Sequence, residues 1–371
     1  MTCRMHSLAS GGCSRREVLL AAAALMVPVP DRRRYDSVAT LLGTGEPGFA
    51  ADQVNNPYGL ALGPDGALYF CDLGNQRIRR IDLATRQATT VAGNGVPSFG
   101  GDGGAATDAS LNMPHEVQFD RAGHLYVAER DNHVVRRIDG QTGIISTLAG
   151  TGRPGFSGDG GPAHAALLRQ PHSIAVTPDG RSLLVCDTGN HRVRRIDLES
   201  GVIDTIGGTG ARDVTPDGAP MRGTPLNGPR TLAFDASGHG YLALREGNAV
   251  FRIEARTAIL RHVAGSGARG YAGDGGPARS AALGGPKGLA WWNDRLFVAD
   301  TENHVIRCID LRTGVIDTVL GSGHPGDGPG PDPRRCALSR PHGVLVDPRG
   351  VLYVADSEAH RVRVLRPRVQ Q

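Results

Sequence analysis

The sequence predicts an all-β fold, a six-bladed β-propeller with four antiparallel strands in each blade. A short phrase of proline, any residue, a small or polar residue and an aliphatic residue recurs six times in 371 residues, at intervals of 57, 57, 58, 57 and 55. Apolar and polar residues alternate in short stretches between these prolines, which is typical of strands. The 53 glycines and 24 prolines supply many turns. A fixed period of this length predicts radial repeats. The prolines are Pro57, Pro114, Pro171, Pro229, Pro286 and Pro341.

Each unit contains four expected strands in the same order, as the third unit illustrates. SIAVTP follows Pro171, a PDG turn comes next, and SLLVCD forms the second strand. NHRVRRID predicts the third strand, and a fourth strand ends at Gly207-Gly208. Because four strands leave both faces of the sheet uncovered, we expect the units to stack around an axis.

The two ends of the repeat region predict how the ring closes. The last unit stops after its third strand, HRVRVLRP, whereas a spare fourth strand, VATLLGTG, occupies residues 38–45. Six fourth strands then match six first strands. We expect the N-terminal strand to complete the last blade, which removes an exposed strand edge.

The first 34 residues read as a leader and residues 35–371 as a single propeller domain. Arg15 and Arg16 precede an apolar run that is too short to span a bilayer, and the segment resembles a twin-arginine export signal. We therefore expect a periplasmic or secreted protein. The alternative is that translation starts at Met26 and the protein is cytoplasmic.

A glycine-rich phrase, G-x-G-x-x-G at residues 150–155, also occurs in dinucleotide-binding folds. Here it recurs after other fourth strands, and no long helix follows it, so we expect a crossover between blades rather than a phosphate loop. Asp102, Asp159 and Asp274 lie in the GDGG phrases of three of these crossovers, and we expect them to cap nearby backbone N–H groups. Calcium is the alternative, although one carboxylate per loop is far from a calcium ligand set.

The repeat phrase P-x-G-[LIV]-A with L-Y-V-A-D and N-H-R-[IV]-R resembles the NHL repeat, over about residues 38–366. The GFSGDGGPA phrase is similar to that of bacterial and teneurin-type members. The fourth unit, YLALREGNAVFRIE, departs most, because it lacks the terminal Asp and the His. The resemblance implies a propeller. It leaves function open, since such domains include protein-binding scaffolds, RNA binders, sensors and a peptidylamidoglycolate lyase.

The residue after each repeat proline is expected to line one mouth of the central channel. Arg230, Lys287 and up to three titratable histidines would make that mouth positive, so an anionic small molecule or an acidic peptide could bind there. A water-filled channel is the alternative. The six positions are Tyr58, His115, His172, Arg230, Lys287 and His342.

The resemblance also raises zinc, because the amidating lyase has zinc histidines at similar P-H starts. His115, His172 and His342 are thus weak metal candidates, with zinc or calcium as the ion. They fall on blades two, three and six, whereas three-fold convergence favours alternating blades. Blade four carries Arg230, a cation that would repel a metal.

Other recurring residues are expected to build the repeat. His133, His191, His304 and His360 begin third strands, and acidic partners for the repeated arginines are Asp72, Asp187, Asp300 and Asp356. Cys71 and Cys186 are expected in the core, and a disulfide between Cys308 and Cys336 is left open. The repeated arginines are Arg79, Arg136, Arg194, Arg252, Arg307 and Arg363.

The sequence therefore favours an exported propeller that is a binding scaffold for a protein or a small anionic ligand. The alternative is a metal-assisted lyase or a lactonase-like hydrolase that uses the central channel. The formal charge of +4 is small, and basic residues alternate with acidic ones, which disfavours nucleic acid as a partner. We expect a monomer with no stable membrane span.

Overall fold

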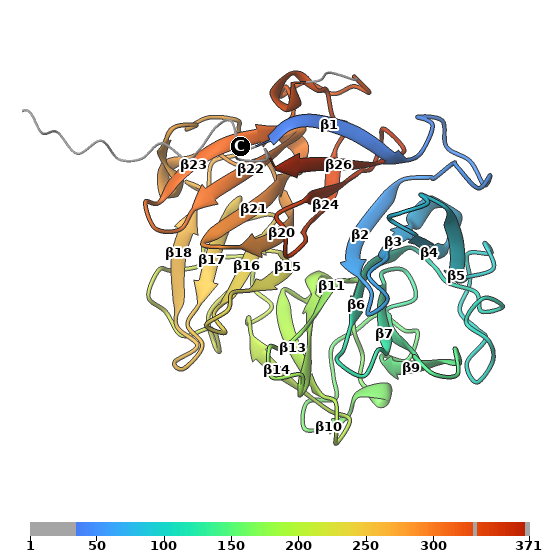
Figure 1. Cartoon of the computed structure of the whole chain (residues 1–371). Coiled ribbons are helices and arrows are strands. Elements are labelled where there is room, and N and C mark those ends of the chain that lie inside the picture. Colours follow the sequence, from blue (N-terminus) through green and yellow to red (C-terminus); the bar gives the residue numbers. More distant parts are fainter. Residues whose placement is uncertain (1–34, 329–331, 368–371) are drawn as a thin grey trace, which may run out of the picture.

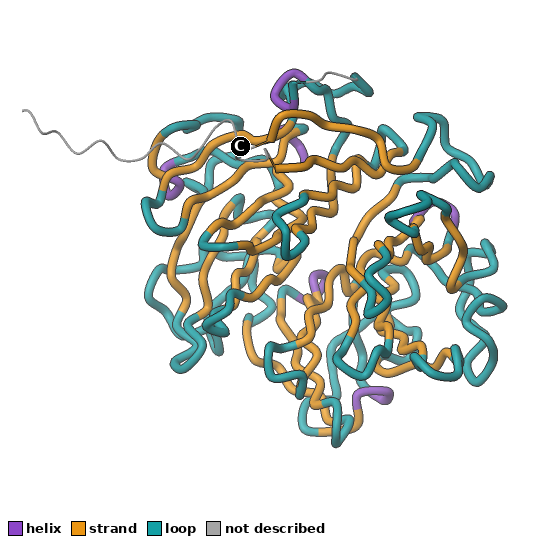
Figure 2. Tube along the Cα trace, viewed as in Figure 1, coloured by secondary structure: helices purple, strands orange, loops and turns teal. Residues whose placement is uncertain are grey.

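Six antiparallel sheets surround a central axis in the computed structural model, which describes residues 35–328 and 332–367. Figures 1 and 2 show them as the wedges of a ring, joined by loops. The predicted all-β, six-bladed propeller is confirmed. The described helices are short 3-10 turns, and none of them has the length and apolar character that a bilayer-spanning helix needs.

Each blade runs from an innermost to an outermost strand in sequence order, except at the closure. Two short strands, β10 (Gly161–Pro162) and β19 (Gly276–Pro277), extend blades three and five. Blades one to three are β2 (Pro57–Leu62), β3 (Leu68–Asp72), β4 (Arg77–Ile81), β5 (Ala88–Ala92); β6 (Pro114–Phe119), β7 (Leu125–Glu129), β8 (Val134–Ile138), β9 (Ile145–Ala149); and β11 (Pro171–Val176), β12 (Ser182–Asp187), β13 (Arg192–Asp197), β14 (Val202–Gly207). Blades four to six are β15 (Pro229–Phe234), β16 (Gly240–Leu244), β17 (Ala249–Ile253), β18 (Leu260–Ala264); β20 (Pro286–Trp292), β21 (Arg295–Asp300), β22 (Val305–Asp310), β23 (Val315–Leu320); and β24 (Pro341–Val346), β25 (Leu352–Asp356), β26 (Arg361–Pro367) with β1 (Tyr35–Leu42).

Blade six is completed by the N-terminal strand, as predicted. β1 pairs antiparallel with β26, with Val38 opposite Leu365, and Figure 1 shows the blue strand lying along the dark red one. The strand begins at Tyr35, three residues earlier than the sequence indicated. β1 is the outermost strand of blade six, and β24 is its innermost strand. The N-terminal strand thus supplies the fourth strand that the C-terminal part of the blade lacks.

The hydrophobic core is divided among the six junctions between blades. Strand β7 illustrates the rule: Leu125 and Val127 pack against blade one, while Tyr126 and Ala128 pack against blade three. Period-two alternation therefore buries both faces of a blade, and each buried aliphatic side chain contributes roughly 1.5–3 kcal/mol. Cys308 and Cys336 lie in the junction between blades five and six.

The repeated histidines connect neighbouring blades, which supports the structural role expected of them. His133 has a left-handed backbone, with φ of 57°, and its Nδ1 accepts a hydrogen bond from the backbone N–H of Gln170 at 3.1 Å. His360 receives the same bond from Asn56 of blade one. Blade four uses Asn248, whose Oδ1 accepts from Gly285 at 2.9 Å. Every blade thus holds the residue before the next repeat proline.

The repeated arginines are buried, with one correction. Arg136, Arg194 and Arg307 are fully enclosed and pair with the acidic residue that ends the second strand. In blade four the equivalent position is Phe251, which lies opposite His262 as Arg194 lies opposite Thr205. Arg252, predicted to fill it, is one residue further on and partly exposed, because the fourth unit aligns one residue out of step with the expectation.

The GDGG aspartates were also predicted wrongly. Asp102, Asp159 and Asp274 pair with the guanidinium groups of Arg136, Arg194 and Arg307. The backbone N–H group that bonds to Asp102 is that of Thr147 on strand β9. The crossover interpretation of the glycine phrase fits the geometry. Gly150 has φ of +90°, and a Cβ there would lie 2.3 Å from the carbonyl oxygen of His133, so only glycine fits. Arg15, Arg16 and Met26 lie outside the described residues.

Candidate functional site at the channel mouth

The six residues after the repeat prolines do come together at one end of the channel. The innermost strands β2, β6, β11, β15, β20 and β24 each contact the next around the ring, which encloses the axis. A cavity of about 200 Å³ lies between them and is lined by five of the six predicted residues. The sixth, His172, is buried against the ring of His115.

Four of these residues form an aromatic arc that runs from blade six to blade three. The ring of Tyr58 stacks on His342 at 4.0 Å between centroids, and it meets His115 edge-on at 4.8 Å. His115 in turn meets His172 edge-on at 4.8 Å. The arc covers one side of the mouth with flat, rigid side chains.

The histidines of this arc are neutral, which corrects the expectation that they add positive charge. Burial lowers the pKa of His115, His172 and His342 well below the usual range. Each Nδ1 lies 2.8–2.9 Å from the carbonyl oxygen two residues earlier, so we assign the proton to Nδ1. Each Nε2 then carries a lone pair.

Arg230 is the main unpaired charge at the mouth. Its side chain lines the cavity and is only 3% exposed. Among residues 35–328 and 332–367, no carboxylate, carbonyl or hydroxyl oxygen accepts a hydrogen bond from its guanidinium. The guanidinium therefore faces the cavity with its donors available, and an anion in the cavity would supply an acceptor for them.

Glu116 lies in the same cavity. Burial raises the pKa of Glu116 to about 7, although the charge of Arg230 opposes this. The carboxyl group can therefore take up or release a proton near neutral pH. The sequence does not single out Glu116, because this residue directly follows a mouth residue within the repeat phrase.

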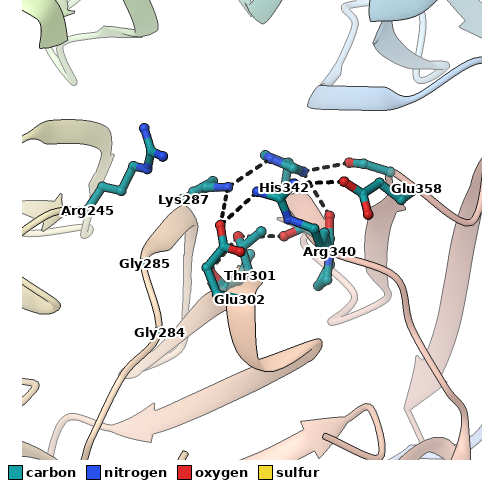
Figure 3. Close-up of polar contacts among 12 residues, drawn as sticks. Arg245, Gly284, Gly285, Lys287, Thr301, Glu302, Arg340, His342 and Glu358 are labelled. Atoms are coloured by element: carbon teal, nitrogen blue, oxygen red, sulfur yellow. Dashed lines mark hydrogen bonds and ion pairs between the residues drawn. The ribbon is translucent and has the colours of Figure 1, made fainter. Parts of the chain in front are cut away.

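Lys287 occupies the equivalent position in blade five and is held by a cluster of polar groups (Figure 3). Its ammonium donates to Glu302 Oε1 at 2.8 Å and lies 3.2 Å from Nε2 of His342. Arg340 also donates to Glu302 at 2.8 Å. Burial alone would raise the pKa of Glu302, but hydrogen bonds from Lys287 and Arg340 outweigh it and lower the pKa to about 2.

Glu302 was not predicted as a site residue, although the sequence contains a signal for it. It stands two residues after Asp300, the end of the second strand, where the same register places Glu246 in blade four and Glu358 in blade six. Aligning that register would have placed three glutamates around the predicted mouth.

The predicted metal residues do not fit a three-histidine zinc site. Nε2 of His342 faces the ammonium of Lys287, and this leaves two imidazole nitrogens where zinc needs three or more protein ligands. Among the described residues, no group of three or more His, Cys, Asp or Glu side chains is placed to hold a metal ion. The aspartates considered for calcium are occupied by arginines.

Comparison with known proteins agrees with the repeat pattern. The NHL repeat family model matches residues 168–196 and 338–365. NHL repeat-containing protein 2 of Bos taurus is 27% identical over 342 residues, covering 85% of this chain and 40% of the relative. Teneurin-1 of Gallus gallus is 30% identical over 291 residues, covering 68% of this chain and 10% of the relative.

The chain is an NHL-repeat β-propeller. It spans less than half the length of these curated relatives. Solved propellers of similar fold include an auxiliary nutrient binding protein from Bacteroides thetaiotaomicron (TM-score 0.65, 17% identity, 89% of this chain and 76% of that one). Another is a gluconolactonase from Xanthomonas campestris (TM-score 0.59, 14% identity, 89% of each chain). At 17% and 14% identity, these two structures resemble this NHL propeller in fold alone.

Proposed function

We propose that this NHL propeller is a binding protein that holds a small anionic ligand at the channel mouth. The observation that carries the proposal is Arg230, a guanidinium that is 3% exposed, lines the cavity and has no acceptor among the described residues. The aromatic arc offers flat surfaces beside that charge. A cavity of about 200 Å³ is below the range of drug-sized ligand sites, which favours a small acid over a peptide.

Titration calorimetry tests this proposal. The full chain is titrated with pyruvate, lactate, succinate and inorganic phosphate. We expect one site per chain for at least one anion, and Arg230→Met should weaken it at least tenfold, because a charge-assisted hydrogen bond is lost. Arg252→Met, which removes a partly exposed arginine from blade four, is the matched control and should bind normally. No heat with any of the anions would contradict the proposal.

We further propose that the protein works outside the cytoplasm after twin-arginine export. The support is the pair Arg15 and Arg16 before an apolar run. A reporter fused to the leader should lose export when both are changed to lysine. A reporter that is never exported, or that is exported equally with both lysines, would contradict this.

A channel hydrolase or lyase is the second candidate. It is favoured by Glu116, whose pKa of about 7 suits an acid or base at neutral pH, and by the likeness in fold to a gluconolactonase. Hydrolysis of a sugar lactone by the full chain, lost in Glu116→Gln, would support it. Metal analysis of the purified protein would test the lyase form that depends on zinc or calcium.

A further inference from the structure

Lysine occurs once in this chain. The sequence has 41 lysine and arginine residues, and Lys287 is the only lysine among them. The equivalent mouth position in blade four is Arg230, so arginine is compatible with this place in the fold. Arginine stays protonated, whereas a buried lysine can lose its proton and react as an amine. The one lysine therefore stands where a reactive amine would meet a ligand.

The surroundings of Lys287 increase the fraction of neutral amine above that of an ordinary lysine. Burial lowers the pKa of Lys287 to about 8, the bond to Glu302 opposes this, and the charges of Arg340 and Arg230 add to it. In about a tenth of the molecules, the Lys287 side chain is then a neutral amine at pH 7. Nε2 of His342, 3.2 Å from Nζ, provides an acceptor beside the nitrogen.

Resting on the proposed function, we propose that Lys287 forms a reversible imine with a small 2-oxo acid whose carboxylate is bound by Arg230. Both side chains line the same cavity, and Figure 3 shows Lys287 and His342 directed toward one another above Glu302. A 2-oxo acid is the smallest ligand class that offers an anion to one residue and an adjacent carbonyl carbon to the other.

The step balances without any oxidant or reductant. The neutral Nζ attacks the ketone carbon and forms a C–N bond, while the carbonyl oxygen takes up a proton and becomes the hydroxyl of a carbinolamine. That hydroxyl leaves as water after protonation, and the nitrogen gives up its second proton, so the products are one imine and one water. Glu116, with a pKa of about 7, lies in the cavity as a proton carrier.

Reductive trapping tests the proposal. The full chain is treated with pyruvate and sodium cyanoborohydride, digested, and mapped by mass spectrometry. We expect one carboxyethyl group on Lys287, with labelling that saturates as pyruvate is raised. Acetone, which has the carbonyl but no carboxylate, should label at least tenfold more slowly. The peptide map separates this product from any label on the α-amine of the chain.

Two variants separate the roles of the cations. Lys287→Arg retains the charge and removes the amine, so it should bind pyruvate in calorimetry without giving an adduct at residue 287. Arg230→Met retains the amine and should raise the pyruvate concentration for half-labelling at least tenfold. Circular dichroism and the thermal midpoint confirm that each variant is folded.

The pH profile is a readout that a merely structural lysine would not produce. Glu302, His342, Arg340 and Arg230 face the ammonium from the neighbouring elements. The labelling rate should rise to a plateau just above pH 8 instead of continuing toward the ordinary lysine pKa.

Saturable labelling that requires Arg230 supports the proposal. Absent labelling, or equal labelling by acetone, overturns it. If pyruvate binds in calorimetry and no adduct forms, the imine is wrong while the binding function stands. If no adduct forms and none of the four anions gives heat in calorimetry, both proposals fail.

Discussion

Blades four and five share one backbone repeat and stabilise it in different ways. In blade five, Arg307 is fully buried between Asp274 at 2.8 Å and Asp300 at 3.5 Å. Asn303 donates to the crossover carbonyl of Gly270 and to Asp300. In blade four, apolar or small residues replace this network, with Leu244 in place of Asp300, Gly247 in place of Asn303 and Phe251 in place of Arg307.

The crossover loops differ accordingly. Tyr271 in the loop before blade five packs over the guanidinium of Arg307 at 5.3 Å. The loop before blade four carries Val214, which is 85% exposed, and a pocket of about 320 Å³ lies between the loop and Phe251. An ionic network thus attaches a loop closely to its blade, whereas its apolar replacement leaves a gap. The blade forms in both cases, since the hydrophobic junctions are preserved.

The largest effect is expected from breaking the network of blade five. Arg307→Met leaves Asp300 buried without its cation, so we expect a loss of about 3–5 kcal/mol in the free energy of unfolding. Arg252→Met in blade four removes a partly exposed side chain and should stay within about 0.5 kcal/mol. Urea unfolding measures both. Equal losses would mean that the buried pair adds nothing beyond a surface charge.

A smaller loss is expected when blade five is converted to the apolar pattern. The double variant Asp300→Leu/Arg307→Phe removes both charges together, so we expect about 1–3 kcal/mol less destabilisation than with Arg307→Met alone. The same urea titration, with the single variants Asp300→Leu and Arg307→Phe completing the double-mutant cycle, gives the coupling. If the double variant is less stable than Arg307→Met, the apolar residues of blade four are stabilising only together with the loop that precedes that blade.

The contribution of Glu302, the carboxylate beside Lys287, to the free energy of unfolding should depend on pH. The folded pKa of Glu302, about 2, lies below its ordinary value of 4.5, so its contribution is present above pH 4.5 and is lost as the pH falls toward 2. Glu302→Gln should therefore cost about 1–2 kcal/mol at pH 6, with the difference from the original chain shrinking below pH 4.5.

Glu246→Gln, at the equivalent position of blade four, is the control for that titration. It loses only an exposed contact with Arg245 at 3.4 Å, worth about 0–1 kcal/mol. A difference for Glu302→Gln that stays constant from pH 6 to pH 2 would contradict the assignment.

The smallest pair of effects concerns the crossover loops themselves. Tyr271→Ala removes a hydrogen bond to Thr318 at 2.8 Å and the contact over Arg307, so about 1–2 kcal/mol should be lost. Val214→Ala should change the thermal midpoint hardly at all, because its side chain is largely in water. A comparable shift of the thermal midpoint for both variants would contradict the gap between the loop that carries Val214 and Phe251.

The fold could be predicted because its determinants are local and repeated. Six prolines mark the innermost strands, and the spare strand near the N-terminus marks the closure through β1 and β26. The mouth residues were located by the same period. The prediction was wrong in blade four, where the repeat is irregular and Phe251 occupies the position expected for Arg252.

The chemistry of the mouth could not be predicted in the same way. Whether His342 is charged depends on burial and on the ammonium of Lys287, and these are properties of packing across blades. Glu116 directly follows the mouth residue His115, and Glu302 stands two residues after a second strand, but their chemical roles depend on burial and on charges from other blades, such as Arg230 and Arg340.

The pairing of β1 with β26 has a consequence for how the protein is made. Val38 leaves the ribosome among the first residues of the domain, and Leu365, opposite it, among the last. Five blades can assemble during synthesis, but the sixth must wait for the final strand, with β1 held unpaired until then. The pairing that closes the ring is therefore available only after the last strand of the domain has been made, and we expect a variant without residues 361–367 to leave the ring open.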